Sequence, residues 1–173
     1  MGADEVADGF HDSLEPREVD RLAAHQMLAN LADERGDEEK AVMELEAAVS
    51  ALDDDPRAYA VLGSYLRSKG HAREAVEVIR ASGEVYLYER PNPALVQELG
   101  LALRDAGDDD DAIEVLEGLL QTLLAQNHHD FPAAGTSALA ELLEKKGDLG
   151  RAADLWRQLS RGTDVAGHLR YHR

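Results

Sequence analysis

The chain has 173 residues, of which 35 are acidic and 18 are basic, and its formal net charge is −17. Because 44% of the residues are hydrophobic, the chain can bury a core, and we expect one folded domain rather than an intrinsically disordered segment. The excess of carboxylates disfavours nucleic acids and anionic membrane surfaces as partners, and the absence of cysteine excludes disulfides, thiolate nucleophiles and cysteine-ligated metal sites.

The N-terminal segment, residues 1–15, is acidic, and we expect it to be mobile. It lacks the basic region followed by an apolar stretch that marks a secretory signal, and nowhere do 18 apolar residues run together. These observations predict a cytoplasmic protein. Pro16, with Ser13 near the cap position, is expected to open the first helix.

An internal repeat decides the expected fold. The pattern of a glycine, four further residues and an alanine occurs four times, and its glycines are 34, 37 and 40 residues apart. A period of this length is typical of stacked supersecondary units. The glycines are Gly36, Gly70, Gly107 and Gly147, and the expected repeats cover residues 22–55, 56–92, 93–132 and 133–162.

Each repeat is expected to be a pair of helices joined at its glycine. Apolar residues recur at intervals of three and four on both sides of the turn, as in helices with one buried face. The glycine stands where a helix C-terminus takes a left-handed residue, and the Asp or His after it can cap the next helix. The expected core positions on the first helices are His25, Leu28, Ala29, Ala32, Tyr59, Leu62, Gly63, Leu66, Val96, Leu99, Gly100, Leu103, Thr136, Leu139, Ala140 and Leu143, and those on the second helices are Ala41, Leu45, Ala48, Ala75, Ile79, Ser82, Ala112, Leu116, Leu119, Ala152, Trp156 and Leu159.

Small residues are expected where the two helices of a pair cross. A large side chain at these positions would splay the helices, whereas glycine or alanine lets the two backbones approach closely. On the first helices these residues are Ala29, Gly63, Gly100 and Ala140, and they are expected to face Ala41, Ala75, Ala112 and Ala152 on the second helices.

The repeat pattern does not predict the structure of two segments. Glu84–Tyr88 alternates briefly like a strand, but we interpret it as a continuation of the preceding helix that ends before Pro91. Residues 163–173 are expected to form a short capping helix or a tail.

The repeat resembles the tetratricopeptide repeat (TPR), which has a 34-residue period and the pattern W-x-x-L-G-x-x-Y followed by A-x-x-x-F-x-x-A. The resemblance covers about residues 22–162, and His25 and Thr136 stand where the family prefers tryptophan. It implies an all-α, right-handed solenoid of about four helical hairpins. The residues that carry it are Tyr59, Leu62, Gly63, Leu66, Ala75, Ile79 and Ser82 in repeat two, and Val96, Leu99, Gly100, Leu103, Ala112, Leu116 and Leu119 in repeat three.

The resemblance also implies a concave groove, lined by the first helices, that binds a peptide or a partner helix. Arg57, Arg67 and Arg104 in this groove predict a locally positive strip, flanked by Val61 and Leu101. Such a strip would bind carboxylates of a partner beside its apolar side chains. The alternative interpretation is that these arginines pair with neighbouring acids such as Asp33, Glu98 and Asp105. The expected groove residues are Gln26, Asn30, Arg57, Val61, Ser64, Arg67, Gln97, Leu101 and Arg104.

The family's clamp for a terminal carboxylate is not expected here. Its five positions hold Gln26, Asn30, Val61, Ala94 and Glu98, and among these residues Asn30 alone matches the clamp.

Other candidate chemistry is sparse. His128, His129 and Asp130 resemble a metal-binding cluster but lack a third ligand at regular spacing, so no metal or other cofactor is expected. The acidic run Asp108–Asp111 is interpreted as the start of a helix. No phosphate-binding glycine loop or nucleophile motif occurs. Tyr86, Tyr88 and Phe131 fall in the expanded parts of repeats two and three, where we expect a secondary binding edge.

The sequence therefore predicts a non-catalytic adaptor or scaffold that binds a protein or peptide with acidic and apolar side chains. One alternative is a small acidic chaperone of the secretion type that holds a client protein. Another is a regulatory fragment of a larger protein. The oligomeric state, the partner and the cause of the acidity, including salt adaptation, stay open at this point.

Overall fold

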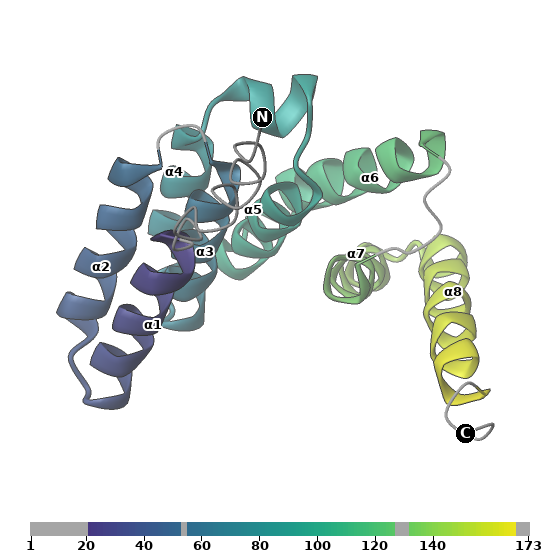
Figure 1. Cartoon of the computed structure of the whole chain (residues 1–173). Coiled ribbons are helices and arrows are strands. Elements are labelled where there is room, and N and C mark those ends of the chain that lie inside the picture. The colour runs from purple at the N-terminus through teal and green to yellow at the C-terminus, as the bar shows by residue number, and fades with distance from the viewer. Residues whose placement is uncertain (1–20, 53–54, 127–131, 169–173) are drawn as a thin grey trace, which may run out of the picture. The chain divides into compact units, whose positions relative to one another are not determined.

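The computed structural model describes residues 21–52, 55–126 and 132–168, with side chains placed as far as Ser160. It divides into two units: unit 1 contains the first two helices and unit 2 contains the others (Figure 1). The elements of unit 1 are α1 (Arg21–Glu34) and α2 (Glu38–Ala51). Those of unit 2 are α3 (Pro56–Ser68), α4 (Ala72–Ala81), the π-helical turn η1 (Val85–Glu89), α5 (Pro93–Ala106), α6 (Asp109–Ala125), α7 (Ala133–Lys146) and α8 (Leu149–His168).

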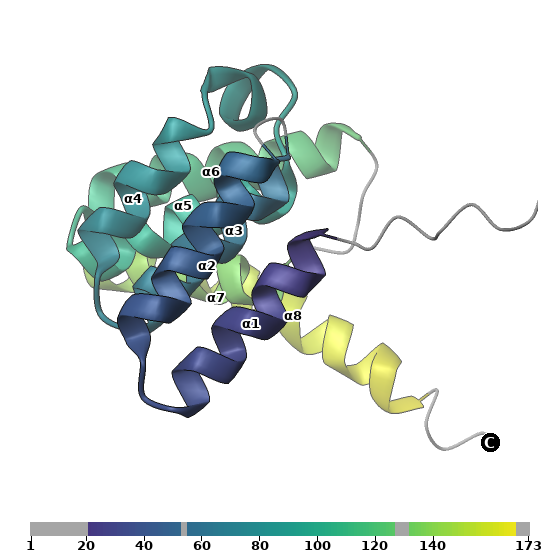
Figure 2. The ribbon, with the colours of Figure 1, turned by 60° about the vertical axis from the view of Figure 1, so that its left-hand side comes forward.

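The helices form antiparallel hairpins, as the repeat predicts. In unit 1, α1 packs on α2; in unit 2, α3 packs on α4, α5 on α6 and α7 on α8. Neighbouring hairpins of unit 2 stack, because α5 also contacts α3 and α4, and α7 also contacts α5 and α6 (Figure 2). The expected all-α solenoid is confirmed, and no strand occurs in the described ranges. In the same ranges, no helix is both long enough and apolar enough to cross a bilayer.

A glycine in the left-handed conformation that the sequence predicts follows the first helix of every hairpin within two residues. The φ angles of Gly36, Gly70, Gly107 and Gly147 lie between 77° and 89°. The residue after each glycine then donates its backbone N–H to a carbonyl five residues earlier, as from Asp108 to Leu103 at 2.9 Å. This hydrogen bond satisfies a carbonyl that the helix end would otherwise leave unpaired.

The next helix is capped by a side chain in two of the four hairpins. Asp37 accepts a hydrogen bond from the backbone N–H of Lys40 at 3.1 Å, and Asp148 accepts one from that of Arg151 at 3.2 Å. At the corresponding positions, the side chains of His71 and Asp108 make no capping hydrogen bond. The expectation of capping residues after the glycines is therefore confirmed at two of the four positions.

The core of unit 2 depends on close contact between the helices of each pair. A Cβ atom on Gly63 would lie 2.6 Å from Ile79, and one on Gly100 would lie 2.5 Å from Leu116. Ala75 and Ala112, which precede these partners by one turn, are fully buried. The expected need for a small residue is confirmed at Gly63 and Gly100, although their nearest neighbours are Ile79 and Leu116 rather than the expected Ala75 and Ala112.

Several expected core or helix assignments are wrong. Trp156 is 36% exposed, and Leu155 beside it is buried instead; Leu28 is 48% exposed. The segment Glu84–Tyr88 does not continue α4, since Gly83 at φ 93° interrupts the chain and a separate π-helical turn follows. No separate capping helix begins at residue 163, because α8 runs without a break to His168.

Candidate functional site

The nine expected groove residues fall on three helices. Gln26 and Asn30 lie on α1, in unit 1, where Gln26 is half-buried and Asn30 is exposed. The other seven lie on α3 and α5, which contact each other in unit 2. We call the solvent-accessible side of α3, α5 and α7 that carries the following half-buried or exposed residues the first-helix face: Val61, Ser64, Arg67, Glu98, Arg104, Asp105, Ser137 and Glu141.

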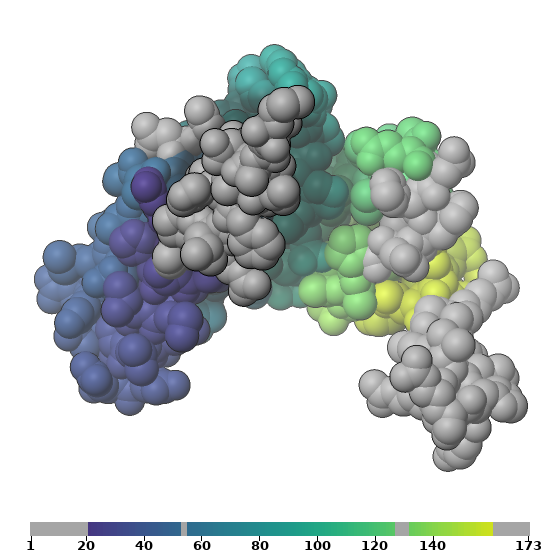
Figure 3. Space-filling model, viewed as in Figure 1, coloured from purple at the N-terminus to yellow at the C-terminus, as the bar shows by residue number. Residues whose placement is uncertain are grey.

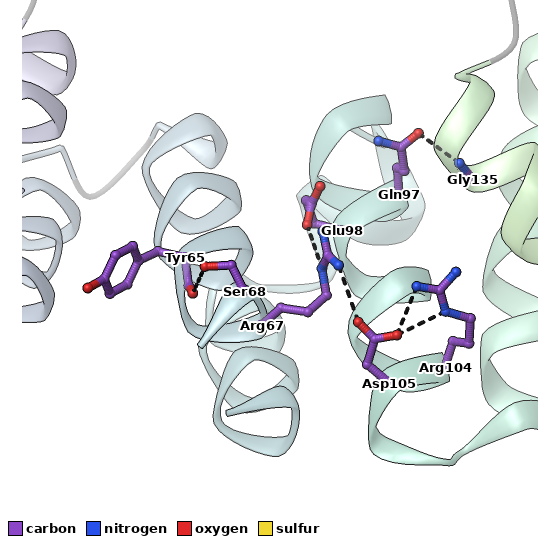
Figure 4. A network of polar contacts seen from close by, with 8 residues as sticks. All are labelled: Tyr65, Arg67, Ser68, Gln97, Glu98, Arg104, Asp105 and Gly135. Carbon is purple, nitrogen blue, oxygen red and sulfur yellow. Dashed lines mark hydrogen bonds and ion pairs between the residues drawn. The ribbon is translucent and has the colours of Figure 1, made fainter. Parts of the chain in front are cut away.

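A row of ion pairs crosses the first-helix face. Arg67 of α3 pairs with two carboxylates of α5, through Nε to Glu98 Oε2 and through Nη1 to Asp105 Oδ2, both at 3.2 Å (Figure 4). Asp105 also accepts a hydrogen bond at 2.9 Å from Nε of Arg104, which in turn lies 3.6 Å from Glu141 of α7. The charges therefore alternate across three neighbouring helices.

The sequence left open whether the groove arginines bind a partner or pair with acids of the chain itself. The structure shows the second arrangement for Glu98 and Asp105. Two arginines meet three carboxylates, so the first-helix face carries no strip of positive charge. Arg67 and Glu98 keep 23% and 15% of their side-chain surface exposed, so both are partly shielded from solvent. Partly exposed pairs of this kind contribute about 0–1 kcal/mol each.

Arg57 belongs to a different local structure. It lies at the start of α3, where its guanidinium pairs with Asp55 at 2.6 Å, and its side chain is 61% exposed. Asp55 also caps the helix, because its carboxylate accepts the backbone N–H of Arg57 at 2.9 Å. The hydrogen bonds from the Arg57 side chain, helped by its backbone N–H and its positive charge, lower the pKa of Asp55.

The uncharged groove residues differ in their exposure to solvent and in their contacts. Leu101 is 4% exposed and belongs to the core, so the expectation that it anchors a ligand is wrong. Val61 and Ser64 are half-buried. Gln97 joins two helices, since its side-chain carbonyl accepts the backbone N–H of Gly135 on α7 at 3.2 Å (Figure 4).

The expected secondary edge is described in part. Tyr86 is half-buried, and Tyr88 is 65% exposed on η1, which projects at the upper edge of the view in Figure 3. Phe131 lies outside the described residues. Tyr88 borders a cleft of about 510 Å³ between α4, η1 and α6. Sequence reasoning missed this cleft because it followed the first helix of each repeat, whereas α4 and α6 are second helices.

The acidic run at the start of α6 has structural partners. Asp109 pairs with Lys145 and Asp110 with Lys146, while Asp111 lies 3.6 Å from Arg80. These pairs connect α6 with α7 and α4, in keeping with the interpretation of the run as a helix start. His128–Asp130 lies outside the described residues. Elsewhere in the described part of the chain, no three His, Asp or Glu side chains gather as a metal site.

Comparison with known proteins identifies the fold by structure and not by sequence. No protein-family profile matches the chain. No curated protein matches it either. Solved structures that are similar to it include MamA, PilF of Pseudomonas aeruginosa, and nearly identical TPR-like repeats of a kinesin light chain from Podospora anserina.

The similarity extends over most of the chain. The structure of MamA is 17% identical, with a TM-score of 0.64 over 85% of this chain and 81% of that one. PilF is 20% identical, with a TM-score of 0.65 over 82% of this chain and 60% of PilF. The kinesin light chain repeats are 21% identical, with a TM-score of 0.61 over 86% and 78% of the two chains. Together with the repeat pattern and the stacked hairpins, these similarities show that the chain has the fold of a tetratricopeptide-repeat protein.

Proposed function

We propose that this chain is a non-catalytic adaptor that holds a segment of a partner protein against the first-helix face. The observation that carries the proposal is the continuity of this face. Charged side chains alternate across α3, α5 and α7, and half-buried Val61 and Ser64 lie on α3 beside the charged row. Such a face offers both polar and apolar contacts to a peptide that lies across several helices.

The charged side chains of the first-helix face are suited to recognition. Arg67 and Arg104 lie beside carboxylates, and a guanidinium stays protonated at all physiological pH values. Guanidinium and carboxylate groups form charge-assisted hydrogen bonds with polar groups of a partner.

A partner with carboxylates must compete with the chain's own acids. Glu141 is 57% exposed and lies 3.6 Å from Arg104, so it is the easiest of the three carboxylates to displace. Glu98 is only 15% exposed and holds Arg67 more firmly. We therefore expect an acidic side chain of the partner to bind at Arg104, with apolar contacts at Val61.

The proposal is tested by site-specific photocrosslinking in lysate of the source organism. Ser64 of α3 and Ser137 of α7 are each replaced by p-benzoylphenylalanine, because both are half-buried on the first-helix face. The control places the same group at Glu77, an exposed residue of α4. We expect one protein to be crosslinked from both serine positions and not from Glu77. No crosslink at either serine, or the same product from all three positions, would contradict the proposal.

A chaperone that holds a client protein is the second candidate, and an observation in unit 1 favours it. Met27, Leu28 and Leu31 of α1 are 67%, 48% and 47% exposed, and flexible Met side chains suit a variable apolar ligand. If this function holds, the chain will prevent aggregation of an unfolded client, and Leu31→Gln will reduce that protection. An adaptor of the first-helix face will show neither effect.

A further inference from the structure

The cleft between α4, η1 and α6 lies apart from the residues that form the first-helix face. It has a volume of about 510 Å³, within the range of about 300–1,000 Å³ typical of ligand pockets. Buried apolar side chains line part of it, and Tyr88 of η1 borders it with 65% of its surface exposed. The buried apolar side chains of the lining are Leu87, Val96, Leu99 and Leu119, and half-buried Pro91 and Val115 also line the cleft.

One wall of the cleft follows α6 for about three turns. Asp111, Glu114, Gly118, Gln121 and Thr122 line it at spacings of one to four residues. From Asp111 to Thr122 the wall extends about 16 Å, at 1.5 Å of rise per residue. This length suits a helix that lies alongside α6 better than a single compact ligand.

Gly118 leaves this wall open. It lies inside the 17-residue helix α6, where glycine is less favourable than alanine. A Cβ atom at Gly118 would meet nothing within 4 Å, so tight packing does not require glycine here. The missing side chain exposes the helix backbone to whatever enters the cleft.

The rim of the cleft is acidic. Three carboxylates, those of Asp111, Glu114 and Glu117, line it together with one cation, Arg80. Arg80 lies 3.6 Å from Asp111, and Glu117 pairs with Arg151. Glu114 is exposed and has no ion-pair partner among the residues that the structure describes. A positively charged ligand can therefore pair with the carboxylate of Glu114, which lies in the middle of the α6 wall.

We propose that this cleft is a second docking site, which binds an amphipathic helix of another protein. The helix inserts large apolar side chains over Leu87 and Leu119, and its Lys or Arg residues pair with Glu114 and the neighbouring carboxylates. The charge of the rim excludes an acidic segment. The net charge of −17 likewise opposes a second copy of this chain as the occupant.

The test uses the full chain and a fluorescein-labelled amphipathic peptide of leucine and lysine, with binding followed by fluorescence anisotropy. Gly118→Phe fills the open wall, and Glu114→Lys reverses the available charge. We expect each substitution to weaken binding by about tenfold. The corresponding peptide of leucine and glutamate should not bind.

Two matched variants control for bulk and charge elsewhere on the surface. Gly150→Phe adds the same side chain to α8, where a Cβ atom would meet only Asp148 at 3.9 Å. Glu46→Lys makes the same charge change at an exposed residue of α2. Both should bind the leucine–lysine peptide like the unmodified chain. Circular dichroism verifies that all four variants keep their helix content.

Three results would overturn the proposal. Equal weakening by Glu114→Lys and Glu46→Lys would show general attraction of a cation to an acidic protein. Unchanged binding to Gly118→Phe would place the peptide outside the cleft. A dimer of the unmodified chain that Gly118→Phe converts to a monomer, measured by sedimentation, would make a second copy the occupant. None of these results bears on the crosslinks from Ser64 and Ser137, so the two proposals can fail separately.

Discussion

Asp55 shows how one side chain can serve both helix formation and ion pairing. Its carboxylate accepts the backbone N–H of Arg57 at the N-terminus of α3 and also pairs with the guanidinium of the same arginine. Pro56 is the first residue of this helix, and its fixed φ angle suits that position. The start of α3 is thus determined by three consecutive residues.

The pKa of Asp55 leads to a pH-dependent stability. Because Arg57 lowers this pKa below the ordinary value of 3.8, the stabilisation is fully present above pH 3.8 and is lost as the pH falls through the folded-state pKa. Asp55→Asn keeps a capping acceptor but removes the charge. We expect the variant to be less stable at pH 7 by at most about 1 kcal/mol, and this difference to shrink below pH 3.8.

Urea unfolding of both chains across this pH range measures the difference. Glu46→Gln, at an exposed residue of α2, controls for the loss of one negative charge. A stability difference for Asp55→Asn that stays constant through the acid range would contradict the assigned cause.

At the scale of helices, the close approach of α5 and α6 depends on a glycine. A Cβ atom on Gly100 would lie 2.5 Å from Cγ and Cδ2 of Leu116, so the Leu116 side chain or one of the two helices must shift to accept it. Helix propensity alone favours alanine over glycine by about 1 kcal/mol. Overpacking of a core costs about 1–3 kcal/mol, which exceeds that gain.

We therefore expect Gly100→Ala to lower the free energy of unfolding, by up to about 2 kcal/mol. Gly118→Ala makes the same change on α6, where nothing lies within 4 Å, and should raise stability by up to about 1 kcal/mol. Urea unfolding measures both. In the background of Leu116→Ala, which removes the clashing side chain, the loss caused by Gly100→Ala should disappear. If Gly100→Ala stabilises the unmodified chain, the close approach is not what disfavours a side chain there.

The helical hairpins could be predicted because the repeat fixes several local features at once. The glycine at each turn needs a positive φ angle, and the apolar spacing on both sides fits a helix period. Which neighbouring residue is buried was harder to predict in the fourth hairpin. There the first helix carries Ala140 where the central hairpins have glycine, and Trp156 is larger than Ile79 or Leu116. Leu155 occupies the core, and the indole N–H of Trp156 donates a hydrogen bond to Glu144 at 2.7 Å.

The candidate sites could be predicted less well because they depend on pairing between distant residues. Sequence placed Arg67 and Arg104 on first helices, but their charge is balanced by Glu98, Asp105 and Glu141 on neighbouring helices. The helix period alone did not distinguish buried Leu101 from an exposed anchor. The cleft beside α6 depends on the turn at Gly83, where the sequence suggested an uninterrupted helix.

At the scale of the whole chain, the net charge of −17 opposes folding. Like charges repel one another more strongly in the compact state than in the extended chain. Salt screens this repulsion, and the Debye length falls from about 10 Å at 0.1 M to about 3 Å at 1 M. The surface ion pairs also weaken, but each contributes only about 0–1 kcal/mol.

We expect the melting temperature to rise when sodium chloride is increased from about 0.05 M to about 0.5 M. Circular dichroism at 222 nm follows the helices directly. A variant with Glu46→Gln, Glu77→Gln and Glu114→Gln carries less negative charge at exposed sites and should show a smaller rise. A melting temperature that falls with salt would mean that attractive ion pairs outweigh the repulsion.

The row of ion pairs from Arg67 to Glu141 also affects the mechanics of unit 2. Its contacts join α3 to α5 and α5 to α7, so they connect successive hairpins rather than the two helices within one hairpin. If each hairpin moves as a body when the stack bends, these contacts change in length together with the packing of α4 on α5 and of α6 on α7. Because salt screens partly exposed ion pairs, we expect the connection between successive hairpins to become more compliant as the ionic strength rises.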